Sequence, residues 1–230
     1  MKLPRALHTW RLSLRQAIAV QRRLAARVIV APPDRELRRV VGLDAAFSVD
    51  GRHCLAAAVV WDRFDRRVAE VATAHRPVRF PYVPGLLSFR EAPALLAALR
   101  KLRQPPDVLM CDGQGLAHPR RFGVACHLGV LCDLPAVGCA KSRLIGEHAE
   151  PPAQAGGTTA LTVKGEVLGA VVRTRTGTRP VFVSVGHKLD LRSAVALVLS
   201  CVRKGRVPEP TRLADRLVAA WKRSGEPPKV

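Results

Sequence analysis

The sequence of 230 residues predicts an α/β fold in which one mixed sheet, part antiparallel meander and part parallel, is flanked by helices. Three strand-like runs, near 39–48, 53–62 and 67–75, follow one another through short turns, as the strands of a meander do. Beyond them, strands alternate with helices, which favours parallel strands joined by crossovers. With 48% hydrophobic residues the chain can bury one core, so we expect a single domain over 1–230.

The first half begins with an amphipathic helix. From Trp10 to about Val28, apolar residues recur at helical spacing and arginines fall mainly on the opposite side. Pro32-Pro33 ends this helix, because proline cannot continue it. In the meander that follows, Asp50-Gly51 is a pair typical of hairpin turns.

The second half supplies the parallel strands. A helix near 89–102 leads to a strand at 107–112. The alternation repeats with a helix near 121–132 and a strand at 135–139. Residues 146–160 contain turn-forming Pro and Gly and predict a mobile surface loop. The last expected elements are a strand pair at 162–174 and 180–185, a helix at 189–203 and a flexible basic tail from about 205.

The charge of the chain indicates its partner. There are 38 Lys and Arg against 18 Asp and Glu, a net charge of +20. This favours nucleic acid, with an anionic membrane surface as the weaker alternative. No apolar run approaches the ~20 residues that span a bilayer, and the arginine-rich start lacks the apolar core of a signal peptide. We therefore expect a cytoplasmic monomer with no membrane partner.

The six cysteines predict neither disulfides nor a metal site. They show no Cys-x-x-Cys pairing and mostly lie in apolar runs, as reduced core residues do. Cys126-His127, Cys132 and Cys139 form the one cluster that could bind zinc, but their spacing matches no common zinc site.

Two aspartates carry the first chemical prediction. Asp44 and Asp112 each end a short apolar strand. Adjacent central strands would bring the two carboxylates together, and oxygen ligands suit Mg²⁺ or Mn²⁺. Such a site can hold a water nucleophile and the leaving oxygen of a phosphodiester in line. Taken singly, each aspartate is more often a turn or helix-cap residue. It is the pair, on a basic protein, that predicts a metal-dependent enzyme acting on a polyanion.

The residues after Asp112 strengthen this interpretation. Gly113 and Gly115 allow the backbone to approach a ligand closely. The helix that follows begins near Arg120 and Arg121, so its N-terminus could meet a phosphate. His118 has two interpretations: it bonds a phosphate or a metal-bound water, or it orders the loop.

The segment from Asp112 to Leu144 closely resembles endonuclease V, the family of deaminated-base repair nucleases. The likeness extends to Phe80–Glu91, Pro180–His187 and Pro208–Arg212, and so covers nearly the whole chain in order. The resemblance implies a ribonuclease-H-like fold and DNA containing deaminated bases as the partner. It also implies hydrolysis of the second phosphodiester bond 3′ to hypoxanthine, with Mg²⁺ or substituting Mn²⁺, leaving a 3′-hydroxyl and a 5′-phosphate.

The resemblance further implies which side chains bind the metal. The family's carboxylate ligands correspond to Asp44, Glu91 and Asp112. Glu91 has a structural alternative, because Ser88 to Glu91 also fits a helix capping box. Pro93 weakens that alternative, since it removes an early backbone donor from a helix starting at Ser88.

Other correspondences concern the nucleic acid. The wedge loop, Pro81–Pro84, corresponds to a family segment that acts at the lesion, where the Tyr82 ring can stack in place of a departed base. Lys141 corresponds to a residue that contacts phosphate near the scissile bond. Asp215 falls, in a loosely aligned tail, where members carry His or Asp near the metal. The residues expected at the nucleic acid are Pro81, Tyr82, Pro84, Gly113, His118 and Arg120.

Two other functions remain open at this point. A nucleic-acid binding protein with little or no catalysis would retain the charge and the wedge loop. A nuclease of the same fold that prefers branched DNA, or inosine-containing RNA, would retain the metal chemistry and change the substrate.

Overall fold

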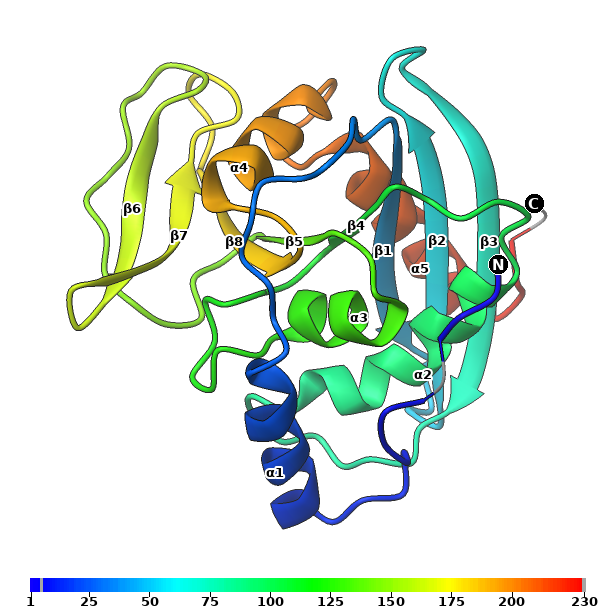
Figure 1. Cartoon of the computed structure of the whole chain (residues 1–230). Coiled ribbons are helices and arrows are strands. Elements are labelled where there is room, and N and C mark those ends of the chain that lie inside the picture. The colour runs from blue at the N-terminus through cyan, green and yellow to red at the C-terminus, as the bar shows by residue number, and fades with distance from the viewer. Residues whose placement is uncertain (5, 229–230) are drawn as a thin grey trace.

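The computed structural model describes residues 1–4 and 6–228, and within them all named strands belong to one eight-stranded sheet (Figure 1). The strands are β1 (Arg39–Phe47), β2 (His53–Asp62), β3 (Arg67–Pro77), β4 (Val108–Cys111), β5 (Ala136–Ala140), β6 (Thr158–Val163), β7 (Glu166–Val172) and β8 (Val181–His187). The helices are α1 (Leu14–Ala25), α2 (Leu87–Arg100), α3 (Val124–Cys132), α4 (Leu191–Ser200) and α5 (Glu209–Ser224).

The topology confirms the predicted fold class. The strands are arranged in the order β3-β2-β1-β4-β5-β8-β7-β6. The meander β1-β2-β3 is antiparallel, whereas β1 pairs with β4 and β4 with β5 in parallel. The later strands return to antiparallel pairing. The site that concerns us lies where the meander meets the parallel strands.

Helices cover both faces of the sheet. Val41 and Leu109 point to the face on which α2 and α3 pack. Val40 precedes Val41, and Met110 follows Leu109. Both point to the opposite face, which carries α4, because successive residues of a strand alternate sides. On that second face α5 packs against β1 and β2, and Figure 1 shows it behind these strands. The sheet is thus buried on both sides around its centre.

Helix α1 is shorter than predicted and forms an outer layer. It begins after Ser13, whose side chain and that of Gln16 form a capping box. Its buried residues, among them Leu24, join Phe89 of α2 and Phe122 in a third apolar cluster. The helix therefore packs over α2 and α3 and not on the sheet itself.

The structure corrects the expected strand at 162–174. This stretch turns back at Lys164-Gly165, and β6 and β7 form an antiparallel hairpin. The two turn residues have φ angles of 52° and 81°. A two-residue hairpin turn requires positive φ at both positions, which glycine adopts without strain. The hairpin extends from the side of the molecule in Figure 1.

The loop before this hairpin is anchored by a buried arginine. Arg173 donates a hydrogen bond from Nε to the carbonyl of Pro152 at 2.9 Å and another from a terminal nitrogen to that of Pro151 at 3.2 Å. The backbone of Glu147 pairs with Thr162 of β6. The mobile loop expected over 146–160 is therefore a fixed one, and it ends where β6 begins.

The prediction of a flexible basic tail from about 205 is also wrong. Residues Glu209–Ser224 form helix α5, with Pro210 in its first turn and Gly225 in the left-handed conformation after its end. Proline at a helix start and glycine just past its end are typical boundaries. Ala214, Val218 and Trp221 are buried, so one side of the helix completes the core.

A glycine in β1 allows α5 to approach the sheet. A Cβ atom on Gly42 would lie 2.0 Å from the carbonyl carbon of Pro210 and 2.5 Å from the nitrogen of Thr211. Only glycine leaves room for backbone this close. Because Gly42 and Asp44 are two residues apart in one strand, they share a face. The start of α5 is thereby fixed beside Asp44, which lies within β1, three residues before its end, and not at the strand end as predicted.

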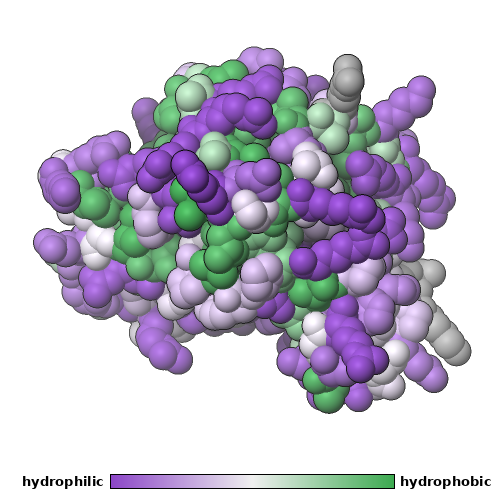
Figure 2. Space-filling view, turned by 90° about the horizontal axis from the view of Figure 1, so that it is seen from below, coloured by the Kyte–Doolittle hydropathy of each residue, from purple (hydrophilic) through white to green (hydrophobic). Residues whose placement is uncertain are grey.

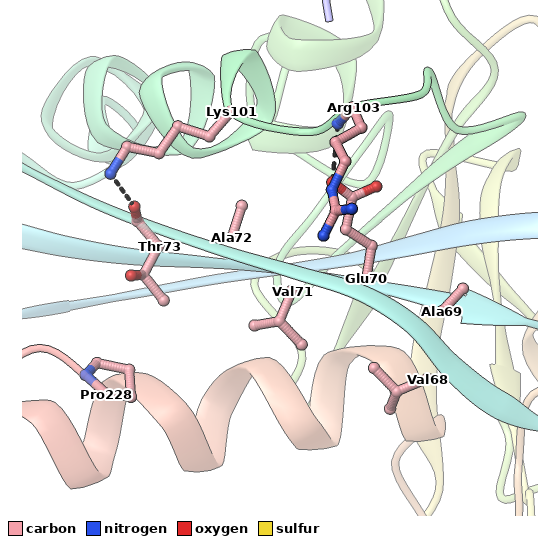
Figure 3. A pocket seen from close by; sticks show the side chains of 9 residues that line it. All are labelled: Val68, Ala69, Glu70, Val71, Ala72, Thr73, Lys101, Arg103 and Pro228. Atoms are coloured by element: carbon pink, nitrogen blue, oxygen red, sulfur yellow. Dashed lines mark hydrogen bonds and ion pairs between the residues drawn. The ribbon is translucent and has the colours of Figure 1, made fainter. Parts of the chain in front are cut away.

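One edge of the sheet is formed by β3, and a cavity of about 680 Å³ lies beside it. Figure 3 shows the side chains that line this cavity. Lys101 donates from Nζ to the carbonyl of Thr73 at 2.7 Å, and the backbone N–H of Arg103 donates to the Glu70 carboxylate at 2.8 Å. Charged side chains on an edge strand oppose pairing with another chain. This cavity follows the strand edge and does not reach the predicted site.

Candidate active site

Asp44 and Asp112 meet at adjacent parallel strands, as predicted. Leu43 is paired with Cys111 in the β1–β4 register, so the residues that follow each lie at the same edge. The backbone N–H of Asp112 donates to the carbonyl of Leu43 at 3.0 Å. Asp44 accepts a hydrogen bond from the N–H of Ala45 at 2.8 Å, which fixes one of its two carboxylate oxygens.

Glu91 reaches the same place from helix α2. The helix begins at Leu87, Leu86 occupies the N-cap position, and no side chain caps it. The capping-box alternative for Ser88 and Glu91 is therefore wrong. Pro93 lies within the helix without ending it. The Glu91 carboxylate is partly buried and lies close enough to feel the charges of both aspartates.

The three carboxylates repel one another. Burial and then the charge of Asp112 raise the pKa of Asp44 to about 8. Burial and then the charges of Asp44 and Asp112 raise the pKa of Glu91 to about 8. Burial likewise raises the pKa of Asp112, although Lys141 opposes the effect. A cluster of like charges with so little solvent requires a counter-charge.

Lys141 provides part of this counter-charge. It follows β5, and its Nζ lies 2.6 Å from Oδ2 of Asp112 and 3.2 Å from Oδ2 of Asp215. Burial lowers the pKa of Lys141, but the two carboxylates outweigh burial and raise it overall. Asp215 belongs to α5, so the helix that replaces the expected tail brings a fourth carboxylate into the site.

The donor set suits a hard divalent cation. Asp44, Glu91 and Asp112 offer carboxylate oxygens only, the ligands that Mg²⁺ prefers. A doubly charged ion would also offset the repulsion that raises their pKa values. Within residues 1–4 and 6–228, no three His, Cys, Asp or Glu side chains converge tightly enough to enclose an ion as they stand. A shared ion therefore requires these side chains to turn toward one point.

A cavity of about 450 Å³ has Asp112 in its wall, whereas Asp44 and Glu91 do not line it. Its wall is formed by the wedge loop, the start of α2, the loop after β4 and the segment after β5. Asp112 and Lys141 line it at one side and Tyr82 at another. Gly113, expected at the ligand, also lines it. The volume is in the range of pockets that bury small ring-containing ligands.

The wedge loop is exposed, as predicted. Tyr82 has 69% of its surface accessible, and Pro81 and Pro84 are exposed beside it. The guanidinium of Arg90 lies 5.8 Å from the centre of the Tyr82 ring and 4.4 Å from that of Phe47. This cation–π arrangement connects the wedge loop to the end of β1.

His118 and Arg120 support the wedge loop from behind. Nδ1 of His118 accepts the N–H of Arg120 at 3.2 Å, so its Nε2 donates to the carbonyl of Gly85 at 3.1 Å. Arg120 donates to the same carbonyl at 2.6 Å and to Gln21. Burial and then Arg120 lower the pKa of His118 to about 4. His118 therefore has the loop-ordering role, through Gly85 directly after the wedge loop, and Arg120 also reaches Gln21 of α1. The expected contact of both side chains with nucleic acid stays a prediction.

Gly115 contacts other parts of the protein. A Cβ atom there would lie 2.0 Å from the carbonyl oxygen of Val185 in β8. Its N–H donates to the hydroxyl of Ser184 at 2.9 Å. The glycine that sequence reasoning assigned to ligand approach therefore packs the loop after β4 onto the sheet.

Several polar residues of the cavity wall were not predicted, Gln21, Ser142 and Arg143 among them. Ser88 and Gln114 both line it and are almost fully buried. Each lies close in sequence to a predicted carboxylate, Ser88 three residues before Glu91 and Gln114 two residues after Asp112. Their closeness in sequence to the predicted carboxylates was the signal that could have identified Ser88 and Gln114 as site residues.

Helix α1 presents arginines to solvent. Arg15, Arg22 and Arg23 of α1 are exposed, as the amphipathic pattern predicted. Figure 2 shows the molecule from below the view of Figure 1, with hydrophilic residues around a more hydrophobic middle. Among residues 1–4 and 6–228, no helix is both long and apolar enough to cross a membrane.

Comparison with known proteins gives consistent matches along the chain. A family model described as Endonuclease V matches residues 22–216. The Endonuclease V of Roseiflexus castenholzii is 51% identical, over 94% of this chain and 96% of that protein. The crystal structure of Endonuclease V from Streptomyces avermitilis has a TM-score of 0.89 and 45% identity, covering 94% of this chain and 96% of that one. Ciona intestinalis Endonuclease V, in complex with a 24mer DNA containing an inosine followed by a ribo-adenosine, has a TM-score of 0.80 and 26% identity, covering 93% of this chain and 99% of that one.

Proposed function

Because the chain belongs to the endonuclease V family, we propose that it is a metal-dependent nuclease that cuts DNA beside a deaminated base, hypoxanthine above all. The cut falls at the second phosphodiester bond 3′ to the lesion and leaves a 3′-hydroxyl and a 5′-phosphate. The observation that carries the proposal is that Asp44, Glu91 and Asp112 lie close enough to raise the pKa of Asp44 and Glu91, and that Asp112 lines a cavity of about 450 Å³. The net charge of +20 supports a polyanionic substrate.

Asp44, Glu91 and Asp112 would hold Mg²⁺, with Mn²⁺ as a substitute. When bound, the ion supplies Lewis-acid stabilisation of charge on the phosphate and a lower pKa for a water nucleophile. Lys141 holds Asp112 in place and presents an ammonium group where the scissile phosphate develops charge. Asp215 fixes the other side of that ammonium group.

The cavity and the wedge loop would receive the damaged base. Tyr82 is free to stack in the gap that an extruded base leaves, and Arg90 supports its ring. Asp112 is part of the cavity wall, so a base held there would lie next to one of the three carboxylates. The relative from Ciona intestinalis was crystallised with inosine-containing DNA, which supports the same class of substrate here.

Cleavage mapping tests the proposal. An end-labelled duplex with one inosine is incubated with the protein and Mg²⁺, and the product is sized against a ladder. We expect one nick at the second bond 3′ to inosine, absent with an adenine control and lost in Asp44→Ala and Asp112→Ala. No nick with the native protein, or a nick that survives both substitutions, would refute the proposal.

A second substrate class is favoured by one observation. The DNA in the Ciona intestinalis complex carries a ribo-adenosine after the inosine. We infer that inosine-containing RNA is a further candidate for this chain. Running the same sequence as RNA beside DNA under single-turnover conditions ranks the two substrates.

A further inference from the structure

Three side chains, the half-buried His8 and the buried His127 and Ser88, form a hydrogen-bonded chain from the N-terminal segment to the cavity wall. Nδ1 of His8 lies 2.7 Å from the carbonyl oxygen of Thr9. Nε2 of His8 lies 2.8 Å from Nε2 of His127. Nδ1 of His127 lies 3.0 Å from the hydroxyl of Ser88. Neither the predicted metal site nor the wedge loop explains why these groups are joined.

Both imidazoles are neutral. Burial lowers the pKa of His8. Burial and then the nearby His8 lower the pKa of His127 to about 3. His127 is fully buried among the rings of Trp10, Phe89 and Phe122, an environment that disfavours a charge. A neutral imidazole has one donor nitrogen and one acceptor nitrogen.

This rule fixes the direction of every hydrogen bond in the chain. The carbonyl of Thr9 can only accept, so Nδ1 of His8 carries the hydrogen and its Nε2 accepts. Nε2 of His127 must then donate to His8, which leaves its Nδ1 as an acceptor. The hydroxyl of Ser88 therefore donates to His127, and its only hydrogen is committed there. What remains on Ser88 Oγ is lone pairs.

Ser88 lies in the wall of the cavity, in the first turn of α2. Gln114 lines the same cavity from the loop after β4. Its amide nitrogen donates to the carbonyl of Ser142 at 3.0 Å, which orients the amide. Its oxygen Oε1 is buried and has no donor among the described residues. Two polar side chains of this wall are thus set as hydrogen-bond acceptors.

We propose that Ser88 is a specificity-determining residue that accepts a hydrogen bond from N1–H of hypoxanthine, and that His127 and His8 are positioning residues that keep its hydroxyl in this orientation. The inference rests on the proposed function. Deamination of adenine changes N1 from a lone pair into an N–H group. An acceptor at this position attracts hypoxanthine and repels the N1 lone pair of adenine. It does not separate hypoxanthine from guanine, which also carries N1–H.

Nitrogen NMR of the histidine rings tests the orientation without any substrate. Two-bond ¹H–¹⁵N correlation spectra at pH 7 distinguish protonated from unprotonated ring nitrogens. We expect His8 protonated at Nδ1 and His127 protonated at Nε2. Protonation of His127 at Nδ1, or of both its nitrogens, would overturn the assignment.

A comparison of substrates tests whether Ser88 accepts a hydrogen bond from N1–H of the base. Duplexes with hypoxanthine or unsubstituted purine, whose N1 has only a lone pair, are compared by kcat/KM. In Ser88→Ala the loss of one hydrogen bond is expected to lower kcat/KM for the hypoxanthine duplex roughly five- to thirtyfold relative to the native protein. The kcat/KM for the purine duplex should change less than twofold. Equal losses on both bases, or no loss on hypoxanthine, would overturn the proposal.

A matched pair of variants tests the role of His127. His127→Phe retains the ring shape among the surrounding aromatic residues and removes the acceptor. His127→Asn retains an acceptor oxygen near the position of Nδ1. We expect the hypoxanthine preference to fall in the first variant and to be largely retained in the second. Equal behaviour of the two would make His127 a packing residue only.

The outcomes separate this inference from the proposed function. If the native protein does not cut the inosine duplex, the proposed function fails, while the NMR assignment still stands or falls by itself. If the native protein cuts and Ser88→Ala keeps the native hypoxanthine-to-purine ratio, the proposed function stands and the inference fails.

Discussion

Lys141 and Asp112 form the closest ion pair of the candidate active site, with 2.6 Å between Nζ and Oδ2. The same Nζ lies 3.2 Å from Asp215, so one ammonium group joins the end of β5, the end of β4 and helix α5. A cation at the meeting point of carboxylates that raise one another's pKa holds the site together. Its removal should therefore affect both charge balance and catalysis.

The first prediction concerns this lysine. Lys141→Ala leaves Asp112 and Asp215 without their ammonium partner and removes a positive charge from the phosphate site. We expect the single-turnover cleavage rate to fall roughly hundredfold, as for the loss of one group that stabilises developing charge. Lys164→Ala, in the exposed β6–β7 turn, is the matched control. A rate within twofold of the native value in Lys141→Ala would contradict the assignment.

A second prediction separates stability from function at the carboxylates. Asp44→Asn removes a carboxyl group whose ionisation is opposed in the folded protein by burial and by Asp112, so without metal the protein should gain stability, by about 1 kcal/mol. Mg²⁺ should raise the melting temperature of the native protein and have no such effect on the variant. Chelation should abolish cleavage. Thermal denaturation with and without Mg²⁺ measures both; a destabilised variant that still responds to Mg²⁺ would speak against a shared metal site.

A third prediction addresses the contact between β1 and α5. In Gly42→Ala the new methyl group meets the backbone of Pro210, which cannot move aside as a flexible side chain would. We expect a loss of roughly 1–3 kcal/mol in the free energy of unfolding and slower cleavage, because α5 carries Asp215. Gly205→Ala is the control, since its nearest neighbour would be an Arg212 side-chain atom at 3.6 Å. Equal denaturation midpoints for the two variants would contradict the prediction.

A fourth prediction concerns pH. The pKa of His127 is about 3 in the folded protein against an ordinary value of 6.5, so the unfolded chain takes up this proton first on acidification. The stability contributed by the neutral ring is complete above pH 6.5 and is lost as the pH falls toward 3. In His127→Phe the free energy of unfolding should decline less steeply between pH 6.5 and 4, by up to about 1.4 kcal/mol per pH unit. His75→Gln, at an exposed histidine, controls for removal of a histidine as such; identical slopes in the native protein and His127→Phe would refute the assignment.

The fifth prediction concerns the wedge loop. Tyr82→Ala removes an exposed ring that contributes little to the core, so stability should stay within about 0.5 kcal/mol of the native value. Binding of inosine duplex should weaken by roughly 1–3 kcal/mol through lost stacking, whereas Tyr82→Phe should retain most of it. Fluorescence anisotropy with labelled duplex measures the difference. Equal affinity in the alanine variant would remove Tyr82 from the interface.

Local sequence patterns determined the meander, the parallel strands and the positions of Asp44 and Asp112. These features depend on strand length and turn residues, which lie within a few positions of one another. Asp112 directly follows β4 as predicted, whereas β1 continues three residues past Asp44. The family resemblance then added Glu91, Lys141 and the wedge loop. Helix α5 was missed although Pro210 and Gly225 mark its ends, because its basic residues and prolines were interpreted as a tail.

Only the tertiary structure decided how these side chains are used. His118 and Arg120 hold the residue after the wedge loop because Gly85, more than thirty residues earlier in the chain, comes within hydrogen-bonding distance. Asp215 enters the site because Gly42 admits α5 to the sheet. The orientation of the Ser88 hydroxyl depends on His8, 119 residues away from its partner His127. Hydrogen-bond direction and close backbone contact are properties of groups brought together by folding, and no local pattern in the sequence records them.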